Sequence, residues 1–152
     1  MIKVGLAKNE HATLISELEI DNFNSEAYTL EYINNIIANN HILKNNTNIF
    51  TICDDDELLG YIIFTISEDF TDIYKIFVRE NDRQKGYGAM LIDKVFNLAK
   101  RYNSKKILIE VRSMNQNAIK FYEKNNFTYI SIRKEYYKNP SDDALIYERK
   151  IT

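Results

Sequence analysis

The sequence predicts one mixed α/β domain, residues 1–152, in which helices cover the faces of a central sheet. Segments rich in Ile, Phe, Thr and Tyr, typical of strands, alternate with segments whose apolar residues recur at helical spacing. A chain of 152 residues is long enough for one hydrophobic core and short for two. No repeat or low-complexity tract occurs, and Pro140 is the single proline, so nothing marks a linker between domains.

The first half of the chain predicts a strand, two helices and three strands. The opening strand covers Ile2 to Leu6. Apolar residues at helical spacing predict the first helix, namely Leu14, Ile15, Leu18 and Phe23. A second helix, capped by Ser25, is predicted in the same way by Tyr28, Tyr32, Ile33, Ile36 and Ile37. Strands over Asn48–Cys53 and Leu58–Ile66 flank an acidic hairpin turn, and a strand over Thr71–Val78 follows.

The second half predicts a helix, a strand, a helix and two strands. One face of the first of these helices carries Leu91, Val95, Leu98 and Tyr102. The remaining segments are a strand over Ile107–Val111, a helix over Asn115–Lys124, and strands over Phe127–Ile132 and Ala144–Lys150. Strands and helices in this order predict a mixed sheet with helices on its faces.

Composition excludes several classes of protein. Twenty basic and twenty-two acidic residues give a net charge of -2, so no surplus of positive charge is available for a nucleic-acid backbone. No apolar run approaches a membrane span and no secretory signal opens the chain, which predicts a cytoplasmic protein without a membrane partner. Cys53 is the single cysteine and is expected to be a buried strand residue, and His11 and His41 are too far apart in sequence to suggest a metal site.

Two glycines one residue apart, Gly86 and Gly88, stand between a predicted strand and a predicted helix. Without a Cβ, the backbone there can approach a phosphate closely, and the N–H groups and dipole of a helix N-terminus attract anions. Arg83 and Lys85 add positive charge. Two spaced glycines suit an ordinary turn equally well. The segment is not a dinucleotide-binding motif, because Leu91 stands where the third glycine is needed. It is not a Walker loop either, because no Gly-Lys-Ser/Thr follows.

The segment Arg83-Gln84-Lys85-Gly86-Tyr87-Gly88 resembles the acyl-coenzyme A loop of the GNAT family of N-acetyltransferases, Gln/Arg-x-x-Gly-x-Gly/Ala, at every defined position. The resemblance implies a GNAT-like fold, with a mostly antiparallel twisted sheet of about seven strands and helices on both faces. It also implies that the diphosphate of acetyl-CoA binds this loop and that its pantetheine arm follows the preceding strand. The cofactor-binding residues so implied are Ile76, Phe77, Val78, Arg83, Gln84, Lys85, Gly86, Tyr87, Gly88, Ala89 and Asn115.

A second stretch, Glu110 to Phe127, resembles the later motif of that family, a strand followed by Asn-x-x-Ala-x-x-(Phe/Leu)-Tyr-Glu-x-x-Gly-Phe. Asn126 replaces the usual glycine, and Asn is the residue that best tolerates a left-handed helix end after glycine. Together with Ile132–Tyr137, this stretch resembles the bacterial ribosomal-protein-alanine N-acetyltransferases over roughly residues 71–150. The Phe-Pro-Trp-like segment of that branch is replaced by Phe23-Asn24-Ser25, in a region that helps to shape the acceptor site.

Glu110 is the candidate general base. Attack on a thioester needs a neutral amine, and a carboxylate within an apolar strand can take the proton of that amine, directly or through water. The alternative interpretation is a sheet carboxylate that pairs with Lys105, Lys106 or Arg112. The resemblance favours the functional role.

Tyr122 is the candidate general acid, which would protonate the departing sulfur. It lies four residues after Ala118, on the same helical face. A tyrosine that merely packs in the core is the alternative. Asn115 is expected to bind the pantetheine amide, to cap its own helix, or both. The Val78 N–H is the candidate group for polarising the thioester oxygen.

The resemblance implies transfer of acetyl from acetyl-CoA to the N-terminal α-amine of a protein or peptide, a ribosomal protein being one candidate, without a metal. An α-amine has a pKa of roughly 7.7–8.0, against about 10.4 for lysine, so it loses its proton readily. Tyr136-Tyr137 either line the acceptor site or pack within a strand. The alternatives are acetylation of a small-molecule amine (polyamine, amino acid or antibiotic), which the absent Phe-Pro-Trp segment and the bulky Phe77 favour, and a non-catalytic acetyl-CoA sensor. A monomer and a homodimer both fit the sequence.

Overall fold

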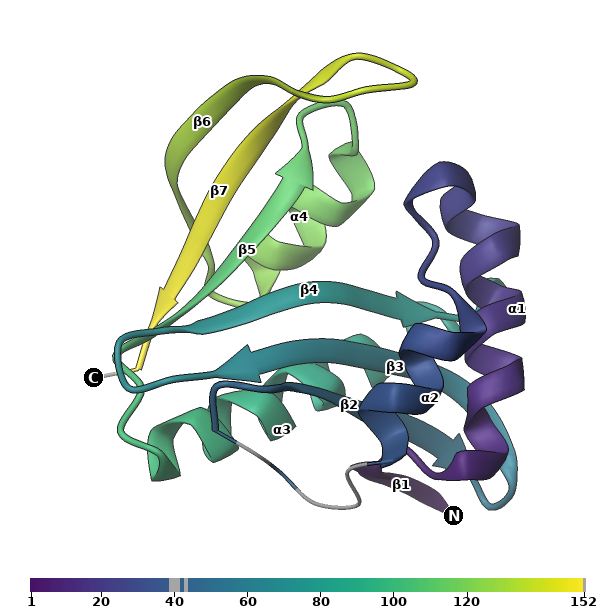
Figure 1. Cartoon of the computed structure of the whole chain (residues 1–152). Helices are drawn as coiled ribbons and strands as arrows, with labels where there is room; N and C mark the ends of the chain where they lie inside the picture. Colours follow the sequence, from purple (N-terminus) through teal and green to yellow (C-terminus); the bar gives the residue numbers. More distant parts are fainter. Residues whose placement is uncertain (39–41, 43, 152) are drawn as a thin grey trace.

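The computed structural model describes residues 1–38, 42 and 44–151. It shows one seven-stranded sheet in the order β1-β2-β3-β4-β5-β7-β6, with helices on both faces (Figure 1). Neighbouring strands run antiparallel except for β4 and β5, which are parallel. The predicted class, a mostly antiparallel mixed sheet of about seven strands, is therefore confirmed.

Every predicted helix and strand is present in the predicted order. The N-terminal elements are β1 (Ile2–Leu6), η1 (Asn9–His11), α1 (Ala12–Phe23), η2 (Asn24–Glu26), α2 (Leu30–Ala38), β2 (Thr47–Asp54), β3 (Glu57–Ile66) and β4 (Thr71–Val78). The C-terminal elements are η3 (Glu80–Asp82), α3 (Tyr87–Arg101), β5 (Lys106–Arg112), α4 (Gln116–Lys124), β6 (Thr128–Tyr137) and β7 (Asp142–Lys150). The largest change in a boundary is at β6, which continues past the predicted end at Ile132 because it pairs with β7 as a long hairpin.

The first two helices differ in detail from the prediction. Leu14 is 44% exposed, and the buried face of α1 is formed instead by Ala12, Ile15, Ser16 and Glu19. The second helix is capped by Thr29 rather than Ser25, since the Thr29 hydroxyl accepts a hydrogen bond from the Tyr32 N–H at 3.1 Å. Tyr28 therefore lies in the connection before α2 and not on the helix.

The sheet separates two hydrophobic layers. On one face α3 and α4 cover a core that includes Phe64, Leu91 and Phe127, and on the other face α1 and α2 cover Ile33, Tyr61 and Ile63. Cys53 is buried in β2, as predicted. None of the helices in the described ranges is long and apolar enough to span a membrane.

The strands β4 and β5 are paired over only a short distance. Thr71–Ile73 pairs with Ile107–Ile109, after which β4 stays with β3 and β5 stays with β7. Figure 1 shows the two strands diverging beyond this contact. A bulge at Tyr74 interrupts the β3–β4 register at the same level. We call the region between the diverging strands the β4–β5 split, and both predicted motifs lie beside it.

Candidate functional site

The backbone of β4 presents to the β4–β5 split polar groups that have no partner on β3. Opposite residues of an antiparallel ladder alternate between hydrogen-bonded and non-hydrogen-bonded pairs. The Arg79 N–H donates to the Leu59 carbonyl at 2.9 Å, which makes the adjacent pair of Gly60 and Val78 non-hydrogen-bonded. Val78, and Ile76 two residues before it, therefore direct their N–H and C=O groups away from β3 and towards the split.

Phe77 has the opposite orientation. Its backbone pairs with Tyr61 on β3, and its side chain is buried against Phe23 and Tyr61, with ring centroids 6.1 and 5.7 Å apart. The predicted backbone contact of Phe77 with a cofactor is thus not available on the split side. Of the three strand residues predicted to bind a cofactor, Ile76 and Val78 offer their amides.

The loop after β4 has the conformation of an anion-binding turn. Gln84 and Gly86 have positive φ angles of 63° and 87°, on either side of Lys85. Such alternation turns successive N–H groups towards one concave side. No protein oxygen in the described ranges accepts a hydrogen bond from the backbone N–H groups of residues 84–89, and α3 begins at Tyr87. Free amides and a helix N-terminus together form a site that suits a diphosphate.

The charged side chains of this loop also hold its shape. The Arg83 Nε donates to the Val78 carbonyl at 2.8 Å, and the Lys85 ammonium lies 3.4 Å from the Asp82 carboxylate. Arg83 thereby ties the loop to the end of β4, and part of the positive charge of Lys85 is offset by Asp82. The backbone N–H groups add unengaged donors to those that remain on these two side chains.

Gly86 and Gly88 are required for different reasons. A Cβ on Gly86 would meet no atom within 4 Å, so this glycine is needed for its positive φ. A Cβ on Gly88 would lie 2.7 Å from the Phe121 ring on α4. Gly88 therefore allows the first turn of α3 to approach α4 closely beside the split.

Glu110 lies on β5 beyond the residues paired with β4. Its carboxylate is 3.2 Å from the Arg133 guanidinium, and the residue is 33% exposed. Its ion-pair partner is thus on β6. The partners considered from the sequence, Lys105, Lys106 and Arg112, do not pair with it. Asp72 lies nearby on β4, and burial together with the charge of Glu110 raises the pKa of its carboxyl group. The two carboxylates and Arg133 form a charged cluster at the point where the strands separate.

Tyr122 lies on α4 and is 7% exposed. Its ring packs between Phe121 and Phe127, with centroid distances of 5.6 and 5.9 Å. Its hydroxyl makes no hydrogen bond to any residue in the described part of the chain, and burial raises its pKa. The hydroxyl is therefore protonated at neutral pH and available as a donor. At the start of α4 the Asn115 side chain caps the helix by accepting from the Ala118 N–H at 3.1 Å.

Arg112 joins three segments around the outer end of the split. Its guanidinium is 3.0 Å from the Glu26 carboxylate, donates to the Pro140 carbonyl at 2.9 Å and stacks 4.2 Å from the centre of the Tyr137 ring. Burial, followed by the charges of Glu110 and Glu26, raises the pKa of Tyr137 to about 12. Sequence reasoning missed Glu26, because its contact with Arg112 spans 86 positions and no local pattern marks it.

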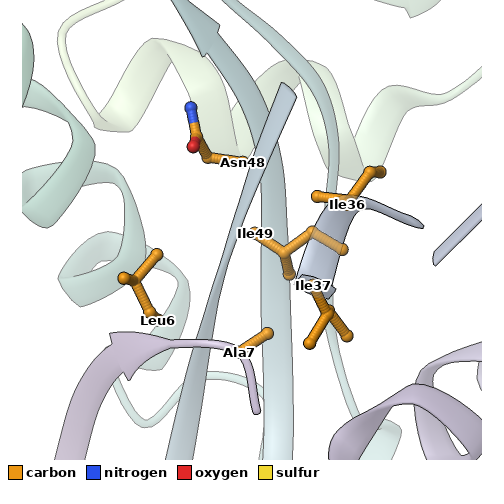
Figure 2. Close-up of a pocket in the computed structure, with 6 residues that line it drawn as sticks. All are labelled: Leu6, Ala7, Ile36, Ile37, Asn48 and Ile49. Carbon is orange, nitrogen blue, oxygen red and sulfur yellow. The ribbon is translucent and has the colours of Figure 1, made fainter. Parts of the chain in front are cut away.

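A small cavity occurs elsewhere, at the opposite edge of the sheet. It lies between α2 and the strands β1 and β2 and is lined by Leu6, Ala7, Ile36, Ile37, Asn48 and Ile49 (Figure 2). Its volume of about 10 Å³ suits at most a single water molecule. No cluster of potential metal ligands occurs among the described residues, and His41 lies outside them.

The N–H groups at the end of β4, the turn that follows them and the first turn of α3 form one continuous set of unengaged donors beside the split. Residues 11–127 match the family described as "Acetyltransferase (GNAT) family". The chain belongs to this family of acetyltransferases, as its two motifs predict.

Two curated relatives show which branches are similar. An N-alpha-acetyltransferase of Saccharolobus solfataricus is 30% identical over 119 residues, covering 70% of this chain and 71% of that protein. The [ribosomal protein bS18]-alanine N-acetyltransferase of Salmonella typhimurium is 28% identical over 94 residues, covering 60% of this chain and 64% of that protein.

Solved structures confirm the fold. The ribosomal-protein-S18-alanine N-acetyltransferase of Escherichia coli superposes with a TM-score of 0.81 at 19% identity, covering 100% of this chain and 95% of that one. NAA60 of Arabidopsis thaliana, in a crystal structure with acetyl-CoA, superposes with a TM-score of 0.84 at 17% identity, covering 99% of this chain and 100% of that one.

Proposed function

We propose that this acetyltransferase moves the acetyl group of acetyl-CoA onto the N-terminal α-amine of a protein or peptide. The observation that carries the proposal is the composition of the β4–β5 split. Unengaged amides line one side of it, a carboxylate held by Arg133 lies at its inner end, and the hydroxyl of the buried Tyr122 on α4 has no hydrogen bond to a described residue. Relatives named for acetylation of α-amines support this choice of acceptor.

Acetyl-CoA fits the groups on the cofactor side. The backbone N–H groups of residues 84–89 and the N-terminus of α3 would hold its diphosphate. The amides of Ile76 and Val78 would bind the pantetheine arm as a neighbouring strand does. In this arrangement the Val78 N–H lies on the side of the thioester oxygen, where a fixed donor stabilises negative charge as it develops. The exposed Asn115 side chain retains donor capacity for a pantetheine carbonyl while it caps α4.

The reaction is a direct displacement. The amine nitrogen attacks the thioester carbonyl carbon, the C–N bond forms and the C–S bond breaks. Glu110 accepts the proton that the amine loses, directly or through one water, and Tyr122 supplies a proton to the departing sulfur. Because an α-amine has a pKa of roughly 7.7–8.0, a carboxylate base is sufficient at neutral pH.

The acceptor side is formed by charged and aromatic groups from distant segments. Glu26, Arg112 and Tyr137 surround the outer end of the split, and Tyr136 stacks edge-on against Tyr137 at 5.2 Å. These side chains would receive the first residues of a peptide, with a ribosomal protein in the cytoplasm as the candidate substrate. All of the groups involved come from one chain, so a monomer is sufficient.

The structure removes the argument that Phe77 favours a small-molecule amine. The Phe77 ring is buried towards α1 and is 8% exposed, so it does not restrict the split. The replacement of the Phe-Pro-Trp-like segment by Phe23-Asn24-Ser25 is the remaining argument for such an acceptor.

The test is release of free coenzyme A from acetyl-CoA by the purified protein with a panel of peptides that begin with Ala, Ser or Met. Each peptide is paired with the same peptide blocked at its N-terminus, and spermidine and free lysine complete the panel. We expect turnover only with the unblocked peptides and a mass gain of one acetyl group at the α-amine. Turnover with spermidine or lysine alone would contradict the proposal. Binding of acetyl-CoA without any turnover would indicate the sensor instead.

A further inference from the structure

A buried ion pair lies beneath the connection between α1 and α2. Glu19 on α1 is 0% exposed and Lys75 on β4 is 11% exposed, and their charged atoms are 2.6 Å apart. The second Glu19 oxygen accepts a hydrogen bond from the Tyr61 hydroxyl, and the first also accepts from the Tyr28 N–H at 3.0 Å. The pair therefore joins α1, β3, β4 and the connection at a single point.

Lys75 holds the connection itself. Its ammonium donates to the Glu26 carbonyl and lies 4.2 Å from the centre of the Phe23 ring and 4.4 Å from the centre of the Tyr28 ring. A cation between two aromatic faces is attracted by both. The backbone of residues 23–28 is thus fastened to β4, while the Glu26 side chain reaches out to Arg112.

Stability alone does not account for this arrangement. Desolvation of each buried ion costs several kcal/mol, and replacement of a buried ion pair by apolar residues is often neutral or stabilising. Lys75 also has a particular place in the strand. It directly follows the bulge at Tyr74 and precedes Ile76, whose amide faces the split. One side chain therefore links the strand of the cofactor side to the connection that carries Glu26.

We propose that Glu19 and Lys75 are positioning residues for the acceptor. They fix the connection over β4, so that Glu26 meets Arg112 beside Glu110. The kinetic consequence rests on the proposed function, whereas the order of the connection does not.

The variant Lys75→Met keeps the length of the side chain and removes its charge. We expect kcat/KM for the peptide to fall by about 10- to 100-fold, mainly through a higher peptide KM, because small displacements of positioning groups are costly. The KM for acetyl-CoA is expected to stay within about twofold, since the pairing of β4 with β3, which directs the Ile76 and Val78 amides towards the split, is unchanged. An equal rise in both KM values would contradict a role specific to the acceptor.

The double variant Glu19→Gln/Lys75→Met separates positioning from folding. The Gln oxygen still accepts from Tyr28 or Tyr61, and no unpaired buried charge remains, so the melting temperature is expected to recover. The peptide KM should stay raised, because the hydrogen bond of Lys75 to the Glu26 carbonyl and its contacts with the Phe23 and Tyr28 rings are still missing. Recovery of the peptide KM together with the melting temperature would overturn the proposal. Lys44→Met is the matched control, since it makes the same change in an exposed pair with Glu68 at 2.6 Å and should alter neither quantity.

Amide hydrogen exchange tests the same idea without a substrate. In Lys75→Met we expect exchange in residues 23–30 to rise by about tenfold or more, while β3 and β4 keep their protection. Unchanged exchange would refute the positioning role whatever the kinetics show. If exchange rises as expected but the wild-type protein acetylates no α-amine, the proposed function fails and the role of Lys75 in ordering the connection stands.

Discussion

The two sides of the β4–β5 split, the proposed cofactor side and the proposed acceptor side, are built in different ways. The cofactor side is one continuous stretch, residues 76–89, in which strand, turn and helix N-terminus follow each other along the chain. The acceptor side brings Glu26, Glu110, Arg112 and Tyr137 together from three distant segments. Backbone amides dominate the first side and charged or aromatic side chains the second. A site made from a continuous backbone leaves a motif in the sequence, whereas a site assembled from distant side chains leaves only scattered residues.

The largest expected effect is a loss of kcat, and it tests whether a residue of the acceptor side takes the proton of the amine. Glu110→Gln keeps the shape of the side chain and removes the proposed base, so kcat should fall by about 10³-fold. The affinity for acetyl-CoA, measured by calorimetry, should not change. Glu148→Gln is the control, because Glu148 is another ion-paired sheet carboxylate, 3.7 Å from Lys106 and outside the site. Weaker binding of acetyl-CoA by Glu110→Gln would break the division between the two sides.

The second prediction concerns the proton that Tyr122 is proposed to donate to the departing sulfur of coenzyme A. Tyr122→Phe should lower kcat by about 10²-fold, the lower end for a general acid. Its melting temperature should change little, since the hydroxyl has no hydrogen bond to the described protein residues that could be lost. Because burial raises the pKa of Tyr122, the wild-type hydroxyl stays protonated in mildly alkaline buffer, and activity should persist there. Tyr147→Phe, whose hydroxyl faces Glu123, is expected to retain full activity.

The third prediction addresses the cofactor side alone. Gly86→Ala forces a side chain into a left-handed conformation at φ 87°, which costs about 1–2 kcal/mol. Gly88→Ala places a Cβ against the Phe121 ring. Each variant should raise the KM for acetyl-CoA by about tenfold, as expected from a cost of this size, and leave the peptide KM unchanged. Gly5→Ala serves as the control, because no atom lies within 4 Å of the added carbon.

The smallest effect is a dependence of stability on pH that arises on the acceptor side. Burial is the main cause that raises the pKa values of Tyr28 and Tyr137 to about 12 each. The folded protein therefore holds these protons at a pH where the unfolded chain, with a tyrosine pKa of about 10, has lost them. The free energy of unfolding should be unaffected below pH 10 and should fall as the pH rises towards 12. Thermal melts across this range should show a flatter decline for Tyr28→Phe and Tyr137→Phe, and an identical decline would refute the assignment.

The same contrast explains what could be predicted from the sequence. The bounds of β4 and the turn at Gly86 follow from local periodicity and glycine geometry, and the structure has them where predicted, whereas α3 begins at Tyr87 instead of after Gly88. The left-handed conformation of Asn126, at φ 71°, was predictable for the same local reason. The orientation of Phe77 was not, because it depends on the register with β3.

Buried charge was the hardest feature to predict. A glutamate on a helix is normally solvent-exposed, and nothing near Glu19 marks Lys75, 56 positions later, as its partner. The apolar pattern therefore assigned Leu14 to the buried face of α1, where the structure has Glu19. Likewise Arg133 could not be recognised as the partner of Glu110, because that contact depends on how β6 pairs with β7.

The short contact between Thr71–Ile73 and Ile107–Ile109 has a consequence for cooperativity. This strand pairing joins the part of the sheet formed by β1 to β4 to the part formed by β5, β7 and β6. Under the proposed function, the pantetheine arm of acetyl-CoA would extend this pairing as an additional strand and would connect the two parts of the sheet. The enzyme with acetyl-CoA bound would then unfold in a single transition at a higher melting temperature, because the ligand would form part of the sheet.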